Sequence, residues 1–228
     1  MNHEETPLQY LRIIYKTPEF EAFYSALSPR IQIKFDYVIN VISTIYSIPS
    51  KFIKHLENTD LYEMRVSVGN NEYRTVLIAI DKQNVIEATK IILLNAFLKK
   101  DNKDYRKQIE KAKSILKKLE KMIQVDPQKL STLSTANQTL DEKYGKLGSP
   151  SRDKFNEESI GWFYGNMLRE RRKELKLTQK EIADRIGREQ SYIARVEQGK
   201  VDIQLSSFFR IAAVLGIQFI PTFASIIK

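Results

Sequence analysis

A polar stretch near the middle of the chain divides it into two parts. Residues 125–158 are rich in Ser, Thr, Asn, Gln, Asp and Gly, and Pro127, Gly145, Gly148 and Pro150 interrupt any long periodicity. This composition predicts a linker. Its scattered apolar side chains fit short helical turns that dock onto a neighbouring domain; they are Leu130, Leu133, Leu140, Tyr144 and Leu147. We therefore expect one domain over residues 1–121, a linker over 122–158 and a second domain over 159–228.

The composition limits what these domains bind. The 228 residues include no cysteine and are 42% hydrophobic, so we expect apolar cores that form without disulfides. The formal net charge of +9 favours a polyanionic partner, which can be RNA, DNA or acidic lipid. His3 and His55 lie far apart and have no Cys partner, so neither a metal nor a cofactor is expected. With no leader and no run of about 18 apolar residues, we expect a cytoplasmic protein.

The first part has the pattern of an α+β domain. A strand, two helices that open with proline, three further strands and a last helix are expected in this order. Short polar breaks between the last three strands fit hairpin turns and hence an antiparallel meander. The expected ranges are 9–15, 18–27, 29–46, 61–68, 72–80, 85–97 and 102–121.

The second part is predicted to be an all-α bundle. Four short helices are expected over residues 160–175, 179–186, 190–198 and 205–215, with a closing strand over 217–223. Thr178 and Glu181 have the spacing of a capping box, which places the start of a helix at Gln179. Gly187 permits a sharp turn between two helices.

The segment LTQKEIADRIGREQSYIARVEQGK (177–200) resembles the helix-turn-helix of Cro-type (XRE) repressors. By that resemblance, the major groove of operator DNA is contacted by Gln190, Ser191 and Arg195. Arg188 and Tyr192 would lie near the DNA backbone, and Gln179 would hold a phosphate. Glu197 would instead pair with Arg172 for stability. Because one such domain covers one half-site, we expect a homodimer.

Cations on adjacent strands suit a different chemistry in the first part. Arg65 follows Glu63 on one face of a predicted strand, and Arg74 follows Glu72 on the next, so a hairpin can bring both guanidinium groups together. Attack of an RNA 2′-hydroxyl on its neighbouring phosphate builds negative charge that fixed cations stabilise without a metal. A structural ion pair between Glu63 and Arg74 is the competing interpretation.

Two lysines and a tyrosine extend this candidate site. Lys99 and Lys100 follow the last strand, where their side chains can reach back across the sheet. The general base would be Lys54, Lys99 or Tyr105 with a lowered pKa, and we favour Lys99 and Lys100 over Lys54. Tyr105 could alternatively stack on a nucleobase.

The segments LYEMR (61–65), EYR (72–74) and ILLNAFLKKDNKDYRKQIEKA (92–112) resemble the HigB branch of RelE-like mRNA interferases. The resemblance spans nearly all of residues 8–121 and implies a ribosome-dependent endoribonuclease that cleaves mRNA. Many relatives have His two residues before the Phe of their Phe-x-Lys-Lys segment, whereas this chain has Asn95. This departure leaves open whether the first domain is catalytic.

The join between the parts resembles an antitoxin. DEKYGKLGSPSRDKFNEES (141–159) is similar to the stretch before the helix-turn-helix in HigA-type antitoxins, and Met122 lies where such an antitoxin would begin. The favoured interpretation is a toxin that its fused antitoxin neutralises within the chain, while the antitoxin also represses transcription. A DNA-binding regulator with a catalytically inactive first domain is the alternative. A third is a peripheral membrane protein that binds through the basic helix at residues 98–121.

Overall fold

A computed structural model describes residues 9–46, 48, 52–125 and 127–219. The chain forms two compact units, Met1–Asp153 and Lys154–Lys228. The boundary follows Asp153, so the polar join belongs largely to the first unit. Each unit is described separately below.

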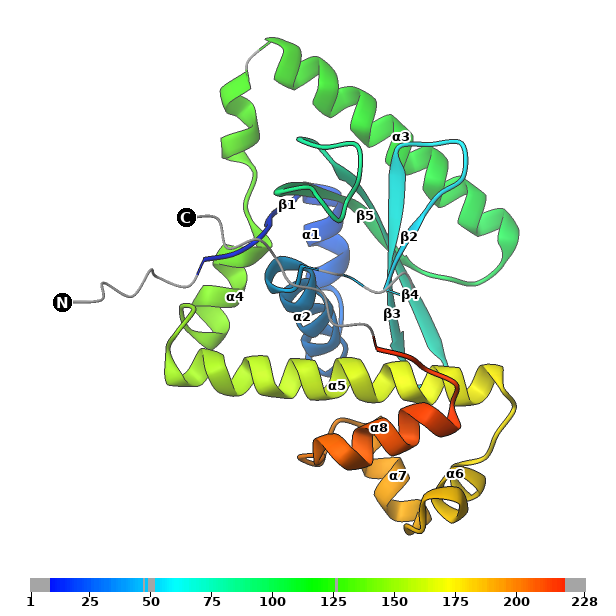
Figure 1. The fold of residues 1–228 in the computed structure, drawn as a ribbon. Coiled ribbons are helices and arrows are strands. Elements are labelled where there is room, and N and C mark those ends of the chain that lie inside the picture. Colours follow the sequence, from blue (N-terminus) through cyan, green and yellow to red (C-terminus); the bar gives the residue numbers. More distant parts are fainter. Residues whose placement is uncertain (1–8, 47, 49–51, 126, 220–228) are drawn as a thin grey trace, which may run out of the picture. The chain divides into compact units, whose positions relative to one another are not determined.

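The first unit is built on a five-stranded sheet (Figure 1). Its elements are β1 (Ile13–Lys16), α1 (Pro18–Ser25), α2 (Pro29–Thr44), β2 (Ile53–His55), β3 (Leu61–Val68), β4 (Asn71–Ala79), β5 (Lys90–Leu98) and α3 (Asn102–Val125). The strand order is β1-β5-β4-β3-β2, with β1 parallel to β5 and the other pairs antiparallel. The predicted α+β class and the meander of β3, β4 and β5 are confirmed, and β1 makes the sheet mixed.

Local chemistry sets the ends of several elements. Thr17 caps α1 by accepting a hydrogen bond from the Phe20 N–H, and Pro18 occupies the first turn, where a missing N–H costs nothing. The last strand was predicted to begin at Val85, but it begins at Lys90. The reason is that the Asp81 carboxylate accepts hydrogen bonds from the backbone N–H groups of Thr89 and Lys90. This holds the preceding residues in a turn.

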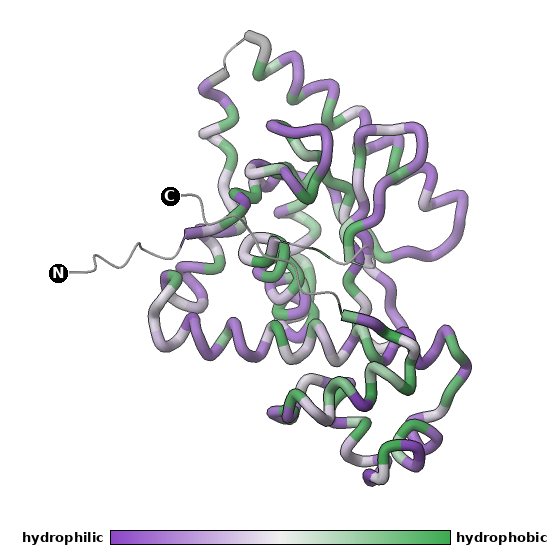
Figure 2. Tube along the Cα trace, in the orientation of Figure 1, coloured by the Kyte–Doolittle hydropathy of each residue, from purple (hydrophilic) through white to green (hydrophobic). Residues whose placement is uncertain are grey.

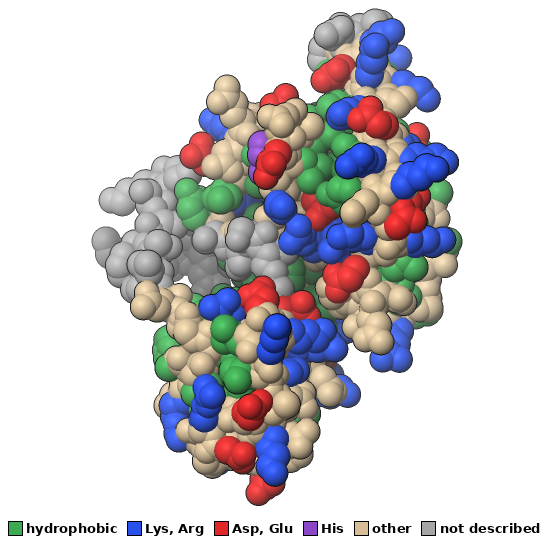
Figure 3. Space-filling model, turned by 90° about the vertical axis from the view of Figure 1, so that its right-hand side faces the viewer, with side chains coloured by type: hydrophobic (Ala, Val, Ile, Leu, Met, Phe, Trp, Pro, Cys, Tyr) green, Lys and Arg blue, Asp and Glu red, His purple; other side chains and the backbone are tan. Residues whose placement is uncertain are grey.

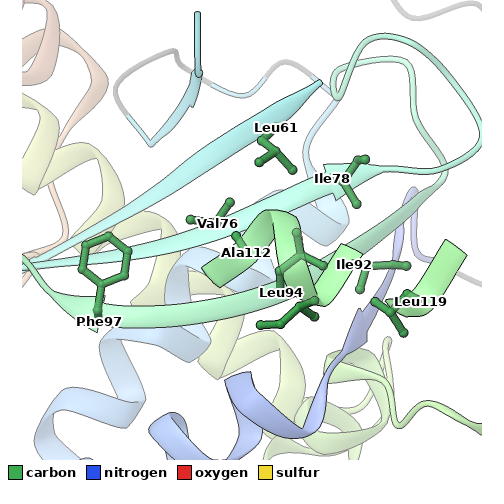
Figure 4. Close-up of a cluster of buried hydrophobic side chains, with 9 residues drawn as sticks. Leu61, Val76, Ile78, Ile92, Leu94, Phe97, Ala112 and Leu119 are labelled. Carbon is green, nitrogen blue, oxygen red and sulfur yellow. The ribbon is translucent and has the colours of Figure 1, made fainter. Parts of the chain in front are cut away.

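The two faces of the sheet have separate cores. Helix α3 packs its apolar stripe on one face, over a cluster made of Leu61, Val76, Ile78, Ile92, Leu94, Phe97, Ala112, Ile115 and Leu119 (Figure 4). Along α3 in Figure 2, hydrophobic positions alternate with strongly hydrophilic ones, as expected for a helix with one buried side. On the other face, Tyr73 of β4 packs edge-on against Phe35 of α2 at 5.8 Å. Helices α1 and α2 therefore cover the face opposite α3.

The polar join is more structured than a linker. It contains a 3-10 helix, η1 (Pro127–Thr132), and α4 (Ala136–Tyr144), whose first turn is capped by Thr135. Leu130 and Leu133 pack against the α3 cluster, while Ala136 and Leu140 are buried. Ala136 and Leu140 are four residues apart and therefore lie on the same side of α4. Through these contacts, the predicted docking turns are part of the first unit.

The second unit consists of helices, as predicted. They are α5 (Pro150–Glu174), which starts before the unit boundary, α6 (Gln179–Ile186), α7 (Gln190–Glu197) and α8 (Leu205–Val214). Helix α5 begins at Pro150 rather than at Ile160, since a proline is tolerated in a first turn. Residues 217–219 form no strand, and the rest of the predicted closing strand lies outside the described residues. A core centred on Ile182, Ile193 and Ile211 holds these helices together.

Candidate functional site

The predicted cations lie on the face of the sheet that α3 covers. Arg65 of β3 is the direct cross-strand partner of Arg74 on β4, and Arg74 is the partner of Phe97 on β5. In the adjacent row, Lys54 of β2 is the partner of Glu63. Direct cross-strand partners share a face, so the sheet brings these residues together near the first turn of α3.

Glu63 connects the arginines. Its side chain is 2% exposed, and its Oε1 lies 2.7 Å from Arg65 Nε and 3.2 Å from Arg74 Nε. A second carboxylate, that of Glu72, lies 3.0 Å from Arg74 Nη1. The proposed structural pairing of Glu63 with Arg74 is therefore confirmed, and Glu63 also holds Arg65. A buried carboxylate is tolerated only when it is paired with cations, so Glu63 depends on both arginines.

The cations differ in their access to solvent. The Arg74 side chain is 9% exposed and is paired with two carboxylates, whereas the Arg65 side chain is 33% exposed. Lys54, Lys99 and Lys100 are exposed. The structure therefore separates one buried support, Arg74, from four cations that an anionic ligand can reach.

Tyr105 is linked to the same carboxylate from α3. Its hydroxyl donates a hydrogen bond of 2.6 Å to Glu63 Oε2. Burial, followed by this hydrogen bond and the charge of Glu63, raises the pKa of Tyr105 above its ordinary value. The expectation of a lowered pKa for Tyr105 is therefore wrong, because its nearest charged partner is an anion rather than a cation. A phenol held neutral in this way is a poor general base.

Tyr105 also has neighbours on its ring. Phe97 contacts it at 5.9 Å between ring centroids, and Lys99 Nζ lies 5.7 Å from its centroid. The lysine is thereby positioned beside the cluster.

Asn95, the departure from the resembled pattern, lies beneath α3. It is 1% exposed, and its Nδ2 donates to the backbone carbonyl and the side-chain oxygen of Gln108, both at 3.2 Å. Its Oδ1 is buried and has no hydrogen-bond partner among the described residues. The side chain is therefore packed under a helix.

The second unit presents the predicted helix-turn-helix. Thr178 and Glu181 form the predicted capping box, and Gly187 ends α6 with φ +65°, a left-handed conformation that favours glycine. On α7, Gln190, Ser191 and Arg195 are exposed. These side chains are thus free to approach a ligand.

The other three residues that were predicted to contact DNA are in contact with side chains of the chain itself. The Arg188 guanidinium lies 5.5 Å from the ring centroid of Tyr192, which is half-buried. Gln179 Nε2 donates a hydrogen bond of 2.9 Å to Glu197 Oε2, which fixes the orientation of its amide. Its contact with phosphate stays a prediction.

The predicted pair of Arg172 and Glu197 is confirmed. Arg172 donates from Nε to Oε1 at 2.5 Å and from Nη2 to Oε2 at 2.9 Å, so the pair is bidentate. The hydrogen bond to Glu197 raises the pKa of Arg172.

Two glycines allow α5 to lie close to α7 and the residues after it. A Cβ at Gly165 would lie 2.2 Å from the Val196 carbonyl oxygen, and one at Gly199 would lie 2.4 Å from the Trp162 nitrogen.

Sequence reasoning missed the surface on which the join docks. Asn137 of α4 caps the free edge of β1, because its Oδ1 accepts from the Ile14 N–H at 2.8 Å and its Nδ2 donates to the Arg12 carbonyl at 3.0 Å. Arg152, whose side chain is fully buried, donates to Asn40 Oδ1 of α2 at 2.9 Å. We call residues 134–152 the docking segment.

A buried aspartate lies at the centre of this surface. Asp36 of α2 accepts hydrogen bonds from the hydroxyls of Tyr24 and Tyr144 at 2.5 and 2.7 Å, and Lys143 Nζ lies 3.2 Å away. Burial and the charge of Asp36 raise the pKa of Tyr24, and burial and the hydrogen bond to Asp36 raise that of Tyr144. The one signal in the sequence is an acidic residue within an otherwise apolar stretch of helix.

The docking surface and the cation cluster lie on opposite faces of the sheet. Tyr73 and Arg74 are consecutive on β4 and so point to opposite sides. Tyr73 packs on Phe35, beside the Tyr24 that binds Asp36, whereas Arg74 binds Glu63. In the described part of the first unit, the docking segment binds the face covered by α1 and α2.

The described residues lack two kinds of feature, a membrane-spanning helix and a metal-binding cluster. None of the helices there is both long and apolar enough to cross a membrane. The same residues contain no group of three or more His, Asp or Glu side chains placed to hold a metal ion.

Comparison with known families gives two matches. Residues 22–117 match the family described as phage derived protein Gp49-like, and residues 168–220 match the family described as helix-turn-helix. The first range covers α2 through most of α3, including the whole cation cluster, and the second covers α6, α7 and α8. No curated protein matches the chain.

Proposed function

We propose that the chain is a self-neutralised toxin–antitoxin protein, in which the Gp49-like region is a toxin domain of the RelE/HigB type and the helix-turn-helix region is an XRE-type antitoxin. Its first unit would cleave mRNA on the ribosome, and its second would bind operator DNA and repress transcription. The observation that carries the nuclease proposal is the cluster of Arg65, Arg74 and Tyr105 around Glu63, with exposed lysines beside it.

In the proposed reaction, the RNA 2′-hydroxyl attacks the adjacent phosphorus, and the 5′-oxygen leaves with a proton. Arg65 and Lys99 would stabilise the negative charge that develops on the phosphate oxygens. Arg74 and Glu63 would position Arg65 without contacting RNA, since both are buried. Lys54, Lys99 and Lys100 remain the candidates for proton transfer, because Tyr105 is held neutral. The products would be a 2′,3′-cyclic phosphate and a 5′-hydroxyl.

Neutralisation would act through bulk rather than through coverage by the docking segment. Its hydrogen bonds fall on β1, α1 and α2, away from the face that carries Arg65. A toxin that must enter the ribosomal A site with an attached second unit is excluded by size. Because the attachment is covalent, the effective concentration of the antitoxin segment is on the order of millimolar.

Repression would use the exposed face of α7. Gln190 can pair with adenine and Arg195 with guanine in the major groove, and Gln179 would hold a phosphate at the start of α6. A homodimer would place two such helices on an inverted repeat.

Expression of residues 1–125 without the second unit tests the toxin proposal. We expect growth arrest, which Arg65→Ala abolishes while Lys82→Ala, an exposed change in the β4–β5 turn, does not. Circular dichroism and thermal unfolding would show that each fragment is folded. A folded fragment that neither arrests growth nor cuts ribosome-bound mRNA would favour the alternative, a DNA-binding regulator with an inactive first domain.

A further inference from the structure

Helix α3 carries a lysine stripe on its solvent side. Residues that are three or four positions apart on a helix share a face. One such face of α3 holds the lysine stripe, which consists of Lys103, Lys107, Lys111, Lys118 and Lys121. Ser114 fills its only gap. All five lysines are exposed. With a rise of about 1.5 Å per residue, the stripe extends over about 27 Å.

These charges are not balanced locally. None of the five lysines forms an ion pair or side-chain hydrogen bond with another residue in the described ranges. The neighbouring exposed stripe differs, because Glu110 and Glu120 alternate there with basic residues and Glu110 pairs with Lys113 at 2.7 Å. The apolar side of α3 is already used for packing on the sheet. Uncompensated like charges on one line repel each other, so the stripe is not explained by stability of the helix.

The stripe continues from the candidate site. Lys99 and Lys100 lie in the short link before α3, where Asp101 separates them from the helix, and Lys103 is in its first turn. In the space-filling view, Lys and Arg side chains gather over the part of the surface that α3 forms (Figure 3). Lysine contacts phosphates as a point charge and carries little geometric selectivity, which suits a backbone of any sequence.

We propose that the lysine stripe binds the phosphate backbone of RNA and extends the cation cluster into a continuous track along α3. The inference rests on the proposed function, in that it identifies how the same unit would hold its RNA. The track would supply affinity that depends on salt but not on sequence, while the cluster at Glu63 would act on the phosphate to be cleaved.

The test compares two triple variants of the full chain that remove equal charge. Lys107→Gln, Lys111→Gln and Lys118→Gln change the stripe, whereas Arg106→Gln, Lys113→Gln and Lys117→Gln change the neighbouring face. Both carry Gln190→Ala and Arg195→Ala, so that α7 contributes little to binding. The probe is a fluorescent single-stranded oligouridine, and anisotropy is measured at salt concentrations of about 50–200 mM.

We expect the stripe variant to bind at least about tenfold more weakly at 100 mM salt, and its slope of log K against log salt to fall by about 2, as the loss of three phosphate contacts predicts. The control variant should change both quantities much less. Equal losses in the two variants would overturn the proposal, as would a stripe-dependent loss seen only with duplex DNA or with phosphatidylserine vesicles. If residues 1–125 cut no RNA but the stripe variant still loses oligouridine binding, the nuclease proposal fails and the RNA track stands.

Discussion

The Tyr105 hydroxyl donates a 2.6 Å hydrogen bond to Glu63, whose other carboxylate oxygen accepts from Arg65. One buried anion therefore joins the first turns of α3 to the central strands of the sheet. Because the Glu63 carboxylate pairs with both guanidinium groups, it also fixes the positions of Arg65 and Arg74. Glu63 is in this sense the residue on which the geometry of the candidate site depends.

Glu63→Gln should lower the stability of the folded chain. The change keeps the shape of the side chain but leaves Arg74 buried with less compensating charge, and we expect the free energy of unfolding to fall by about 3–5 kcal/mol. Urea unfolding of the full chain measures this. Glu72→Gln is the matched control, since its side chain is 39% exposed and it binds the same arginine, so a loss of no more than about 1 kcal/mol is expected. Similar losses for the two variants would contradict the special role of Glu63.

The raised pKa of Tyr105 predicts a loss of stability in alkali. A phenol whose pKa is higher in the folded state contributes stability that is fully present below its unfolded value of about 10 and is lost as pH rises toward the folded value. We expect the unfolding free energy to fall more steeply above about pH 10 for the native chain than for Tyr105→Phe. Tyr24 and Tyr144 act in the same direction, so the variant keeps part of the slope. Parallel pH profiles for the two proteins would rule out this contribution of Tyr105.

Features with a local physical cause could be predicted from the sequence. The capping box of Thr178 and Glu181 needs only a hydroxyl and a carboxylate three residues apart, and it is present. Arg65 and Arg74 meet because a short break forces neighbouring strands to pair. Such contacts need no knowledge of the rest of the fold.

Features that depend on distant packing could not be predicted. The parallel pairing of β1 with β5 joins residues far apart in the chain, and β2 is too short to show an alternating pattern. The docking of Asn137 on β1 depends on the position of that strand at the edge of the sheet, which the local sequence does not reveal. Asn95 shows the same limit, because only the position of α3 reveals that this residue is covered.

Substitutions in the helix-turn-helix should separate base reading from backbone binding. Gln190→Ala, on the exposed side of α7, should relax base preference within an inverted-repeat operator by about 1–3 kcal/mol. Gln179→Ala should weaken all sequences more evenly, since its predicted contact is a phosphate. Gel shifts against an operator panel at several salt concentrations measure both effects. A full chain without operator preference or salt dependence would exclude the proposed repressor function.

The docking segment should hold the two parts together after the chain is cut. A specific protease site inserted beside Asp126 separates the toxin elements from η1 and α4, yet the contacts of Asn137 and Asp36 remain, so the nicked halves should co-elute in size-exclusion chromatography. Asn137→Ala removes two buried hydrogen bonds to β1 and should cost about 2–4 kcal/mol, which raises the Kd of the nicked complex by about two orders of magnitude. Gln138→Ala, on the exposed side of α4, is the control and should leave the complex intact.

Because cutting turns a tethered contact into one that dissociates on dilution, the same proteins should differ in activity. Growth arrest and ribosome-dependent cleavage should rise from the intact chain to the nicked Asn137→Ala protein and should be greatest for residues 1–125. Equal activity of these three proteins would refute neutralisation within the chain.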